Sequence, residues 1–146
     1  MARKQAEMIE VRLTTASAVE AAKGLIEEAA NDLQESVDAV AGTNFENTER
    51  YQNWGDAASS LEAVDFEIDF PGNTGEIEIV TMRAKDEPKG MSKVGRNRFL
   101  IEQAVANLNL VIGHLEACDE VEDDNEVSDI ADAVQAIIDE LESIDL

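Results

Sequence analysis

The chain has 146 residues, of which 44% are apolar and 30% are charged, and its formal net charge is −22. This length and apolar content are enough for one globular domain with its own hydrophobic core, so we expect a single domain over residues 1–146. The single cysteine excludes an internal disulfide, and no apolar run approaches the ~20 residues of a membrane span or the apolar region of a signal peptide. We therefore expect a soluble, cytoplasmic protein.

The charges are distributed unevenly along the chain. No Lys or Arg follows Arg98, whereas the last 48 residues contain 14 Asp and Glu. Six of the eleven basic residues lie in residues 83–98, which we call the basic island. A surface with this overall charge attracts basic partners and predicts binding to a positively charged molecule. Adaptation to high salt is an alternative explanation, because salt-adapted proteins also carry dense carboxylate surfaces.

The first predicted element is a short strand. Residues 8–13 alternate apolar and charged side chains, which is typical of a strand with one buried face. The longer range 3–13 is also compatible with a helix, so both alternatives stay open.

Two helices are expected next. Ser17 and Glu20 have the spacing of a capping box and predict the start of a helix that ends at Gly42. A second helix is expected over residues 48–63. The apolar faces of these two helices consist of Val19, Ala22, Ile26, Ala29 or Ala30, Leu33, Val37 and Val40, and of Tyr51, Trp54, Ala58 and Leu61.

A β-hairpin is predicted after the second helix. Residues 64–70 strictly alternate apolar and acidic side chains, and a second run of strand-like sequence covers residues 76–82. Residues 71–75 between them are rich in glycine and contain a proline, which favours a turn. The two runs are therefore expected to pair with each other.

Such a hairpin would carry a ladder of carboxylates on its solvent face. Asp69 would lie opposite Glu76 and Glu67 opposite Glu78, with Asp65 continuing the row. Carboxylates on one strand are ~6.7 Å apart, so two strands would carry about one charge per 3.4 Å, which equals one strand of duplex DNA. Like charges opposite each other destabilise a sheet. We expect compensation, either from the basic island folding over this face or from a positively charged partner.

The C-terminal half predicts a connection and two helices. Residues 85–96 contain Pro88, Gly90 and Gly95 among basic residues and are expected to form a mobile basic connection. Two helices with identical heptad-like spacing then predict an antiparallel helical hairpin. Their apolar stripes consist of Ile101, Ala104, Leu108, Val111, Leu115 and Cys118, and of Val127, Ile130, Val134, Ile137, Leu141 and Ile144.

Together these elements predict the α+β fold class. We expect a small antiparallel β-hairpin sheet of two or three strands, packed with about four helices that include the C-terminal antiparallel helical hairpin. The two heptad stripes are expected to lie in the core of this domain. The alternative is a homodimer through the heptad faces, which would make the chain a self-associating structural or adaptor protein whose acidity serves solubility.

No motif in the sequence predicts an enzyme, a metal site or a cofactor. His114 is the only histidine, and nothing indicates the orienting group that a nucleophilic pair with the single cysteine requires. Gly90–Asn97 has the glycine spacing of a phosphate-binding loop, but Arg96 and Asn97 replace its Lys and its Ser or Thr. The acidic run 119–129 lacks the ligand positions of an EF-hand. Phosphate or nucleic-acid binding by the basic island is a further alternative, opposed by the surrounding negative charge.

The leading hypothesis from the sequence is an acidic inhibitor that occupies the positively charged nucleic-acid-binding surface of a partner, such as a nuclease, a restriction enzyme or a CRISPR-type complex. In composition the chain resembles phage-encoded DNA mimics and the immunity proteins of nuclease toxins, although no motif assigns it to a family. We expect no direct contact with nucleic acid or with a membrane. The residues predicted to bind the partner are Asp65, Glu67, Asp69, Glu76, Glu78, Asp119, Glu120, Glu122, Asp123 and Asp124.

Overall fold

The computed structural model describes residues 8–45, 47–70, 74–84, 90, 92–117 and 124–144. These residues form a two-stranded antiparallel sheet and four helices, which confirms the predicted α+β class. In chain order the elements are β1 (Met8–Thr14), α1 (Thr15–Ala39), α2 (Glu49–Ala63), the 3-10 turn η1 (Thr74–Glu76), β2 (Glu78–Ala84), α3 (Lys93–Ala117) and α4 (Asp124–Glu142).

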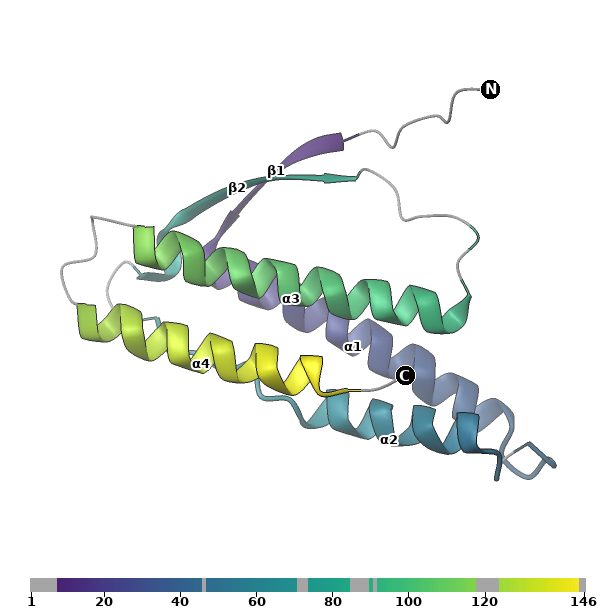
Figure 1. Cartoon of the computed structure of the whole chain (residues 1–146). Helices are drawn as coiled ribbons and strands as arrows, with labels where there is room; N and C mark the ends of the chain where they lie inside the picture. Colours follow the sequence, from purple (N-terminus) through teal and green to yellow (C-terminus); the bar gives the residue numbers. More distant parts are fainter. Residues whose placement is uncertain are drawn as a thin grey trace, which may run out of the picture.

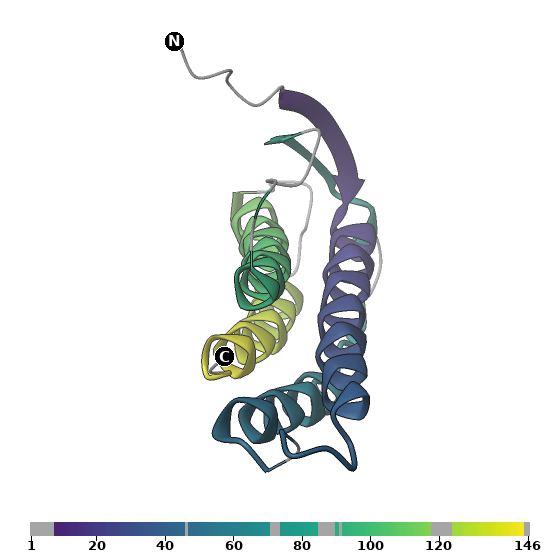
Figure 2. The ribbon, with the colours of Figure 1, turned by 90° about the vertical axis from the view of Figure 1, so that its right-hand side faces the viewer.

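The two longest helices, α1 and α3, run antiparallel along each other (Figure 1). Helix α4 turns back along α3, so that the two form the predicted antiparallel hairpin. Figure 2 shows α1 on one side of the molecule and the stacked pair of α3 and α4 on the other, with α2 packed against α1. The ribbon of β1 and β2 lies over α3, on the side away from α4.

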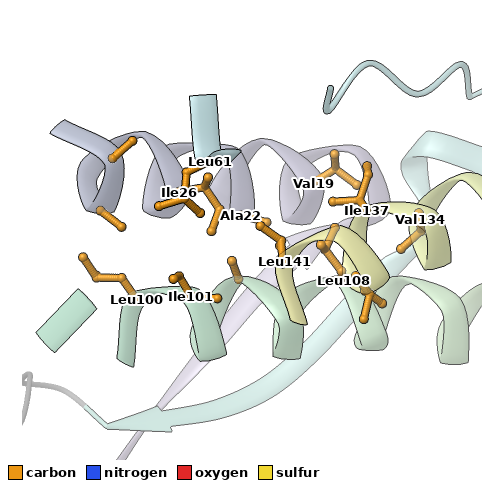
Figure 3. Packing of buried hydrophobic residues seen from close by; sticks show 14 of the residues in the cluster. Val19, Ala22, Ile26, Leu61, Leu100, Ile101, Leu108, Val134, Ile137 and Leu141 are labelled. Carbon is orange, nitrogen blue, oxygen red and sulfur yellow. The ribbon is translucent and has the colours of Figure 1, made fainter. Parts of the chain in front are cut away.

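The core lies between α1 and the α3–α4 hairpin, and α2 closes one end of it. The predicted apolar faces of all four helices point into this core, because their 3.6-residue spacing keeps each stripe on one side of its helix. The exceptions are Val40, which is not part of the core, and Cys118, which lies outside the described residues. Figure 3 shows this packing, with labels on Val19, Ala22 and Ile26 of α1, Leu61 of α2, Leu100, Ile101 and Leu108 of α3, and Val134, Ile137 and Leu141 of α4.

Helix α1 starts earlier than the sequence predicts. Thr14 is its N-cap residue, and the Oγ1 atom of Thr14 accepts a hydrogen bond from the Ser17 N–H at 3.1 Å. The Ser17 Oγ atom in turn accepts one from the Thr14 N–H at 2.7 Å, which completes a capping box. Ser17 therefore supplies the third helical residue of the box, and the predicted pair with Glu20 is wrong. At the other end the helix gives way to a turn that contains Gly42, whose φ of +77° favours glycine.

The second strand pairs with the N-terminal strand, which corrects the predicted hairpin. Met8 lies opposite Ala84 and Thr14 opposite Glu78, so residues 8–14 are a strand and not a helix. The cause is visible at the start of α1. The Thr15 N–H donates to the Ile77 carbonyl at 3.0 Å, and the buried Thr15 hydroxyl donates to the Thr74 carbonyl. These bonds hold the start of β2 beside the end of β1 instead of beside residues 64–70.

The ribbon of β1 and β2 is anchored in the core at one end only. Ile79, near the start of β2, is fully buried. Toward the other end the apolar side chains of Ile9, Met8 and Met82 are 40%, 51% and 57% exposed. Toward this end the ribbon rises away from α3 (Figure 1).

The connection before α3 is shorter than predicted. Lys93 is already the first residue of α3, so residues 93–96 form its first turn. The Ser92 Oγ atom accepts a hydrogen bond from the Gly95 N–H at 3.1 Å, which satisfies one of the free amides at the start of this helix. The expected mobility of residues 85–89 falls outside the described residues.

Candidate functional site

Residues 64–70, which we call the acidic segment, follow α2 and belong to no helix or sheet. The predicted alternation is retained. Val64, Phe66, Ile68 and Phe70 are half-buried against the core, and Asp65, Glu67 and Asp69 are exposed to solvent. The three carboxylates are therefore on the solvent side, as the sequence predicts.

The acidic segment does not pair with a second acidic strand, so the predicted carboxylate ladder is wrong. Glu76 lies in η1, and Glu78 lies in β2 beside β1. The Arg12 Nη1 atom lies 3.1 Å from the Glu78 Oε1 atom, across the strand pair. A diagonal pair of opposite charges stabilises a sheet, whereas the predicted like-charge pairs would destabilise it. One strand alone carries its carboxylates ~6.7 Å apart, which is half of the predicted charge density.

The link between the acidic segment and β2 depends on close packing at Gly75. A Cβ atom added to Gly75 would lie 3.0 Å from the Phe70 Cβ atom and 3.4 Å from the Ala16 Cβ atom. Only glycine leaves room for the backbone to pass between these two side chains. Phe70 thus fixes the end of the acidic segment against the first turn of α1.

A groove of about 740 Å³ lies between α1 and the acidic segment. Its apolar lining comes from Ala16 and Val19 of α1 and from the half-buried side chains of the acidic segment. Its charged lining consists of one lysine, Lys23, and four carboxylates, those of Glu20, Asp65, Glu67 and Asp69. A second hollow of about 300 Å³ shares Lys23, Val64 and Phe66 with the groove and adds Glu27 and Glu62. The two hollows together make an acidic strip along one side of α1.

Two cations of the basic island bind elsewhere than this strip. Lys93 and Arg96, in the first turn of α3, bind Asp32 and Glu28 of α1, with Nζ–Oδ1 and Nη2–Oε1 distances of 3.6 and 2.6 Å. The fully buried Asn97 donates from its Nδ2 atom to the Asp32 Oδ2 atom at 3.0 Å. These contacts join α3 to α1. In the described part of the chain, the carboxylates of the acidic segment make no ion pair, and Asp65 accepts only the Glu67 N–H, at 2.8 Å.

The second predicted acidic patch is described only at its last residue. Asp124 begins α4. Asp119, Glu120, Glu122 and Asp123 lie outside the described residues. The structure therefore brings Asp65, Glu67 and Asp69 together in one row, places Glu76 in η1 and Glu78 in β2, and does not test the patch before α4.

The residues that suggested other chemistry have local roles. Arg96 and Asn97 of the phosphate-loop-like sequence contact α1, and the turn before them is capped by Ser92. The His114 Nδ1 atom lies 2.8 Å from the Leu110 carbonyl, one turn earlier in α3. Within the described residues, no group of three or more His, Cys, Asp or Glu side chains is arranged to hold a metal ion.

Sequence reasoning missed the contribution of α1 to the site. Glu20, Lys23 and Glu27 are exposed, and they border the acidic segment although they precede it by about 40 residues in the chain. Their spacing of three and four residues places them on one helix face, which borders the apolar stripe. That spacing could have predicted a charged face on this helix, but it does not predict which segment of the chain lies beside that face.

Comparison of the chain with protein-family models, with curated protein sequences and with solved structures gives no match. Among the helices of the described residues, none combines the length and the apolar character needed to cross a membrane.

Proposed function

We propose that this protein is an acidic binding protein that occupies the positively charged, nucleic-acid-binding surface of a partner protein and thereby inhibits it. The observation that carries the proposal is the row of Asp65, Glu67 and Asp69, which is exposed and makes no ion pair within the described residues. Two of the six cations that had been candidates to cover it, Lys93 and Arg96, bind α1 instead. The partner class includes nucleases, restriction enzymes and CRISPR-type complexes.

Charge geometry supports a protein partner more than a nucleic acid. The acidic strip carries carboxylates from α1 and from the acidic segment, and among the described residues Lys23 is the only cation that lines it. A nucleic acid would be repelled by this strip and by the net charge of −22. A cleft of Lys and Arg that binds phosphates would be attracted by the same field, with an association rate that falls as salt is added.

The alternative of a self-associating adaptor would require another surface. The predicted heptad stripes are already buried against the core, with Leu108, Val111 and Val134 fully inaccessible to solvent. A homodimer through these faces would have to open the α3–α4 hairpin away from α1. The acidic-inhibitor proposal requires no such rearrangement.

The test uses proteins that already bind DNA. Proteins from a cell extract are retained on DNA-cellulose, eluted with salt, dialysed, and passed over the immobilised chain. We expect specific retention that short duplex DNA or heparin prevents, because the polyanion and the chain compete for one basic surface. Retention of no DNA-binding protein, or retention that polyanions leave unchanged at low salt, would refute the proposal.

A matched pair of variants assigns the effect to the acidic segment. Asp65→Asn/Glu67→Gln/Asp69→Asn removes the row, and Asp129→Asn/Asp132→Asn/Glu140→Gln removes the same charge from exposed positions of α4. We expect the first variant to lose at least about tenfold in affinity and to show a weaker salt dependence, since fewer ion contacts form. The second should bind nearly as well as the parent protein. Equal losses would mean that only net charge matters.

A further inference from the structure

The acidic segment has the properties of a strand without a partner. Residues 64–70 belong to no helix, turn or sheet, their side chains alternate between half-buried apolar and exposed acidic residues, and their Val, Ile and Phe residues favour strands. Within the described residues, the backbone groups of residues 66–70 form no hydrogen bond with another backbone group. The Glu67 N–H reaches the Asp65 carboxylate, and the Val64 N–H reaches the Leu61 carbonyl. Within the described residues, the backbone groups of residues 66–70 are therefore without backbone partners.

A groove that could accept a second strand runs along this segment. It is lined by every residue from Val64 to Phe70, and on the α1 side by Ala16, Val19, Glu20 and Lys23. Successive side chains of an inserted strand would point alternately toward the apolar lining and toward the solvent-exposed carboxylates. The groove thus offers backbone groups without backbone partners, an apolar lining for one side of an added strand, and carboxylates for its other side.

We propose that this groove binds an extended segment of the partner protein in which basic and apolar residues alternate, and that this segment adds a strand to residues 64–70. The inference rests on the proposed function, since it specifies how the same acidic row recognises its partner. Backbone hydrogen bonds would supply affinity, and the alternation would supply specificity. Basic side chains would face Asp65, Glu67 and Asp69, and apolar side chains would pack beside Phe66 and Ile68.

A second copy of this chain is a poor occupant of the groove. Pairing two acidic segments would set carboxylates opposite carboxylates, which destabilises a sheet. It would also bring together two chains that each carry a net charge of −22. A basic strand would replace each of these repulsions with an opposite-charge pair. Charge complementarity therefore favours a basic segment over self-association.

The test compares two peptides of identical composition on the full chain. The first is acetyl-Lys-Val-Lys-Val-Lys-Val-Lys-amide, and the second is acetyl-Lys-Lys-Val-Val-Val-Lys-Lys-amide. Affinities are measured by fluorescence anisotropy in 0.15 M salt, and amide hydrogen exchange is followed residue by residue by NMR. We expect the alternating peptide to bind at least about tenfold more tightly. It should also slow exchange at every second amide of residues 65–70, because alternate amides of a strand point to the same edge.

Two variants make the readout specific. Asp65→Asn/Glu67→Gln/Asp69→Asn should abolish most of the preference for the alternating peptide, whereas Asp129→Asn/Asp132→Asn/Glu140→Gln should retain it. Each variant is checked for an unchanged amide spectrum away from the substitutions, so that a folding defect is recognised. Loss of the preference in both variants would overturn the proposal.

The outcomes separate this inference from the proposed function. Equal binding of the two peptides, or binding without alternate amide protection, would overturn strand addition. DNA-competed retention of basic proteins would then still support the proposed function. Conversely, alternate protection by the first peptide together with no DNA-competed retention would support strand addition and refute nucleic-acid-surface inhibition.

Discussion

The guanidinium of Arg96 lies 2.6 Å from the carboxylate of Glu28, and this contact ties the first turn of α3 to the middle of α1. One turn further along α1, Asp32 forms an ion pair with Lys93 and accepts a hydrogen bond from Asn97. Both acidic residues face α3, whereas Glu20 borders the groove and Glu27 borders the second hollow, on another side of the helix. The carboxylates of α1 that face α3 are therefore paired with cations of α3, whereas those beside the acidic segment are not.

Removing the positive charge of Arg96 should lower the free energy of unfolding only slightly, and added salt should make this loss smaller. Arg96→Gln is expected to lower the free energy of unfolding by at most about 1 kcal/mol, because the pair is partly exposed. Urea denaturation at 0.02 and 0.5 M NaCl measures the effect. Arg50→Gln is the matched control, since it removes the same charge from an exposed residue that makes no ion pair among the described residues. Equal losses in both variants would show that the contact with Glu28 contributes nothing specific.

Two glycine substitutions should change stability in opposite directions. Gly75→Ala should destabilise the protein by about 1–3 kcal/mol, because its methyl group would meet the side chain of Phe70 at 3.0 Å. Gly113→Ala, at an exposed position of α3 with nothing within 4 Å, should stabilise it by about 0.5–1 kcal/mol through helix propensity. Thermal and urea unfolding measure both. A tolerated Gly75→Ala would mean that the acidic segment is not held tightly at Phe70.

A charged side chain placed in the heptad stripe of α4 should strongly destabilise the protein. Ile137 is 4% exposed, so Ile137→Asp should cost several kcal/mol by burying an unpaired carboxylate. Ala136→Asp adds the same charge at an exposed position and should cost little. Unfolding curves and light scattering are measured together. An Ile137→Asp variant that stays folded and changes from oligomer to monomer would assign the stripe to a subunit interface.

Moderate salt should stabilise the protein. Repulsion across a surface with a net charge of −22 is screened as ionic strength rises, while burial of apolar side chains is little affected. We expect the Tm to increase between very low salt and ~0.3 M NaCl. A Tm that decreases over this range would contradict the argument. Unfolding at all concentrations below molar salt would instead support adaptation to high salt.

The helices were predictable because each carries its own signal. The apolar stripes of α1, α3 and α4 repeat at helical spacing, and this periodicity can be recognised without knowing which distant residues pack against the helix. Cap positions were less predictable. Thr14 and Ser17 form the observed capping box, but Ser17 and Glu20 match the same pattern in the sequence.

Strand pairing was not predictable from local pattern. Residues 64–70 have the alternation of a strand and lie next to a turn-forming sequence, so a hairpin with the following run was the simplest interpretation. The observed pairing depends on bonds from Thr15 to Thr74 and Ile77, which join parts of the chain about 60 residues apart. The exposed side of the acidic segment was predicted correctly, because alternation determines the two faces whichever partner a strand has.

The pairing of β1 with β2 has a kinetic consequence. Met8 meets Ala84, so the ribbon closes only after α1, α2 and the acidic segment have been synthesised. Until then β1 is a short strand that leads directly into a helix and has no partner for its backbone. Contacts between distant parts of a chain slow folding, because a long loop must be ordered before they form. Helices α1 and α2, which are adjacent in sequence and pack together, can assemble first, and ribbon closure is then expected to be a late step.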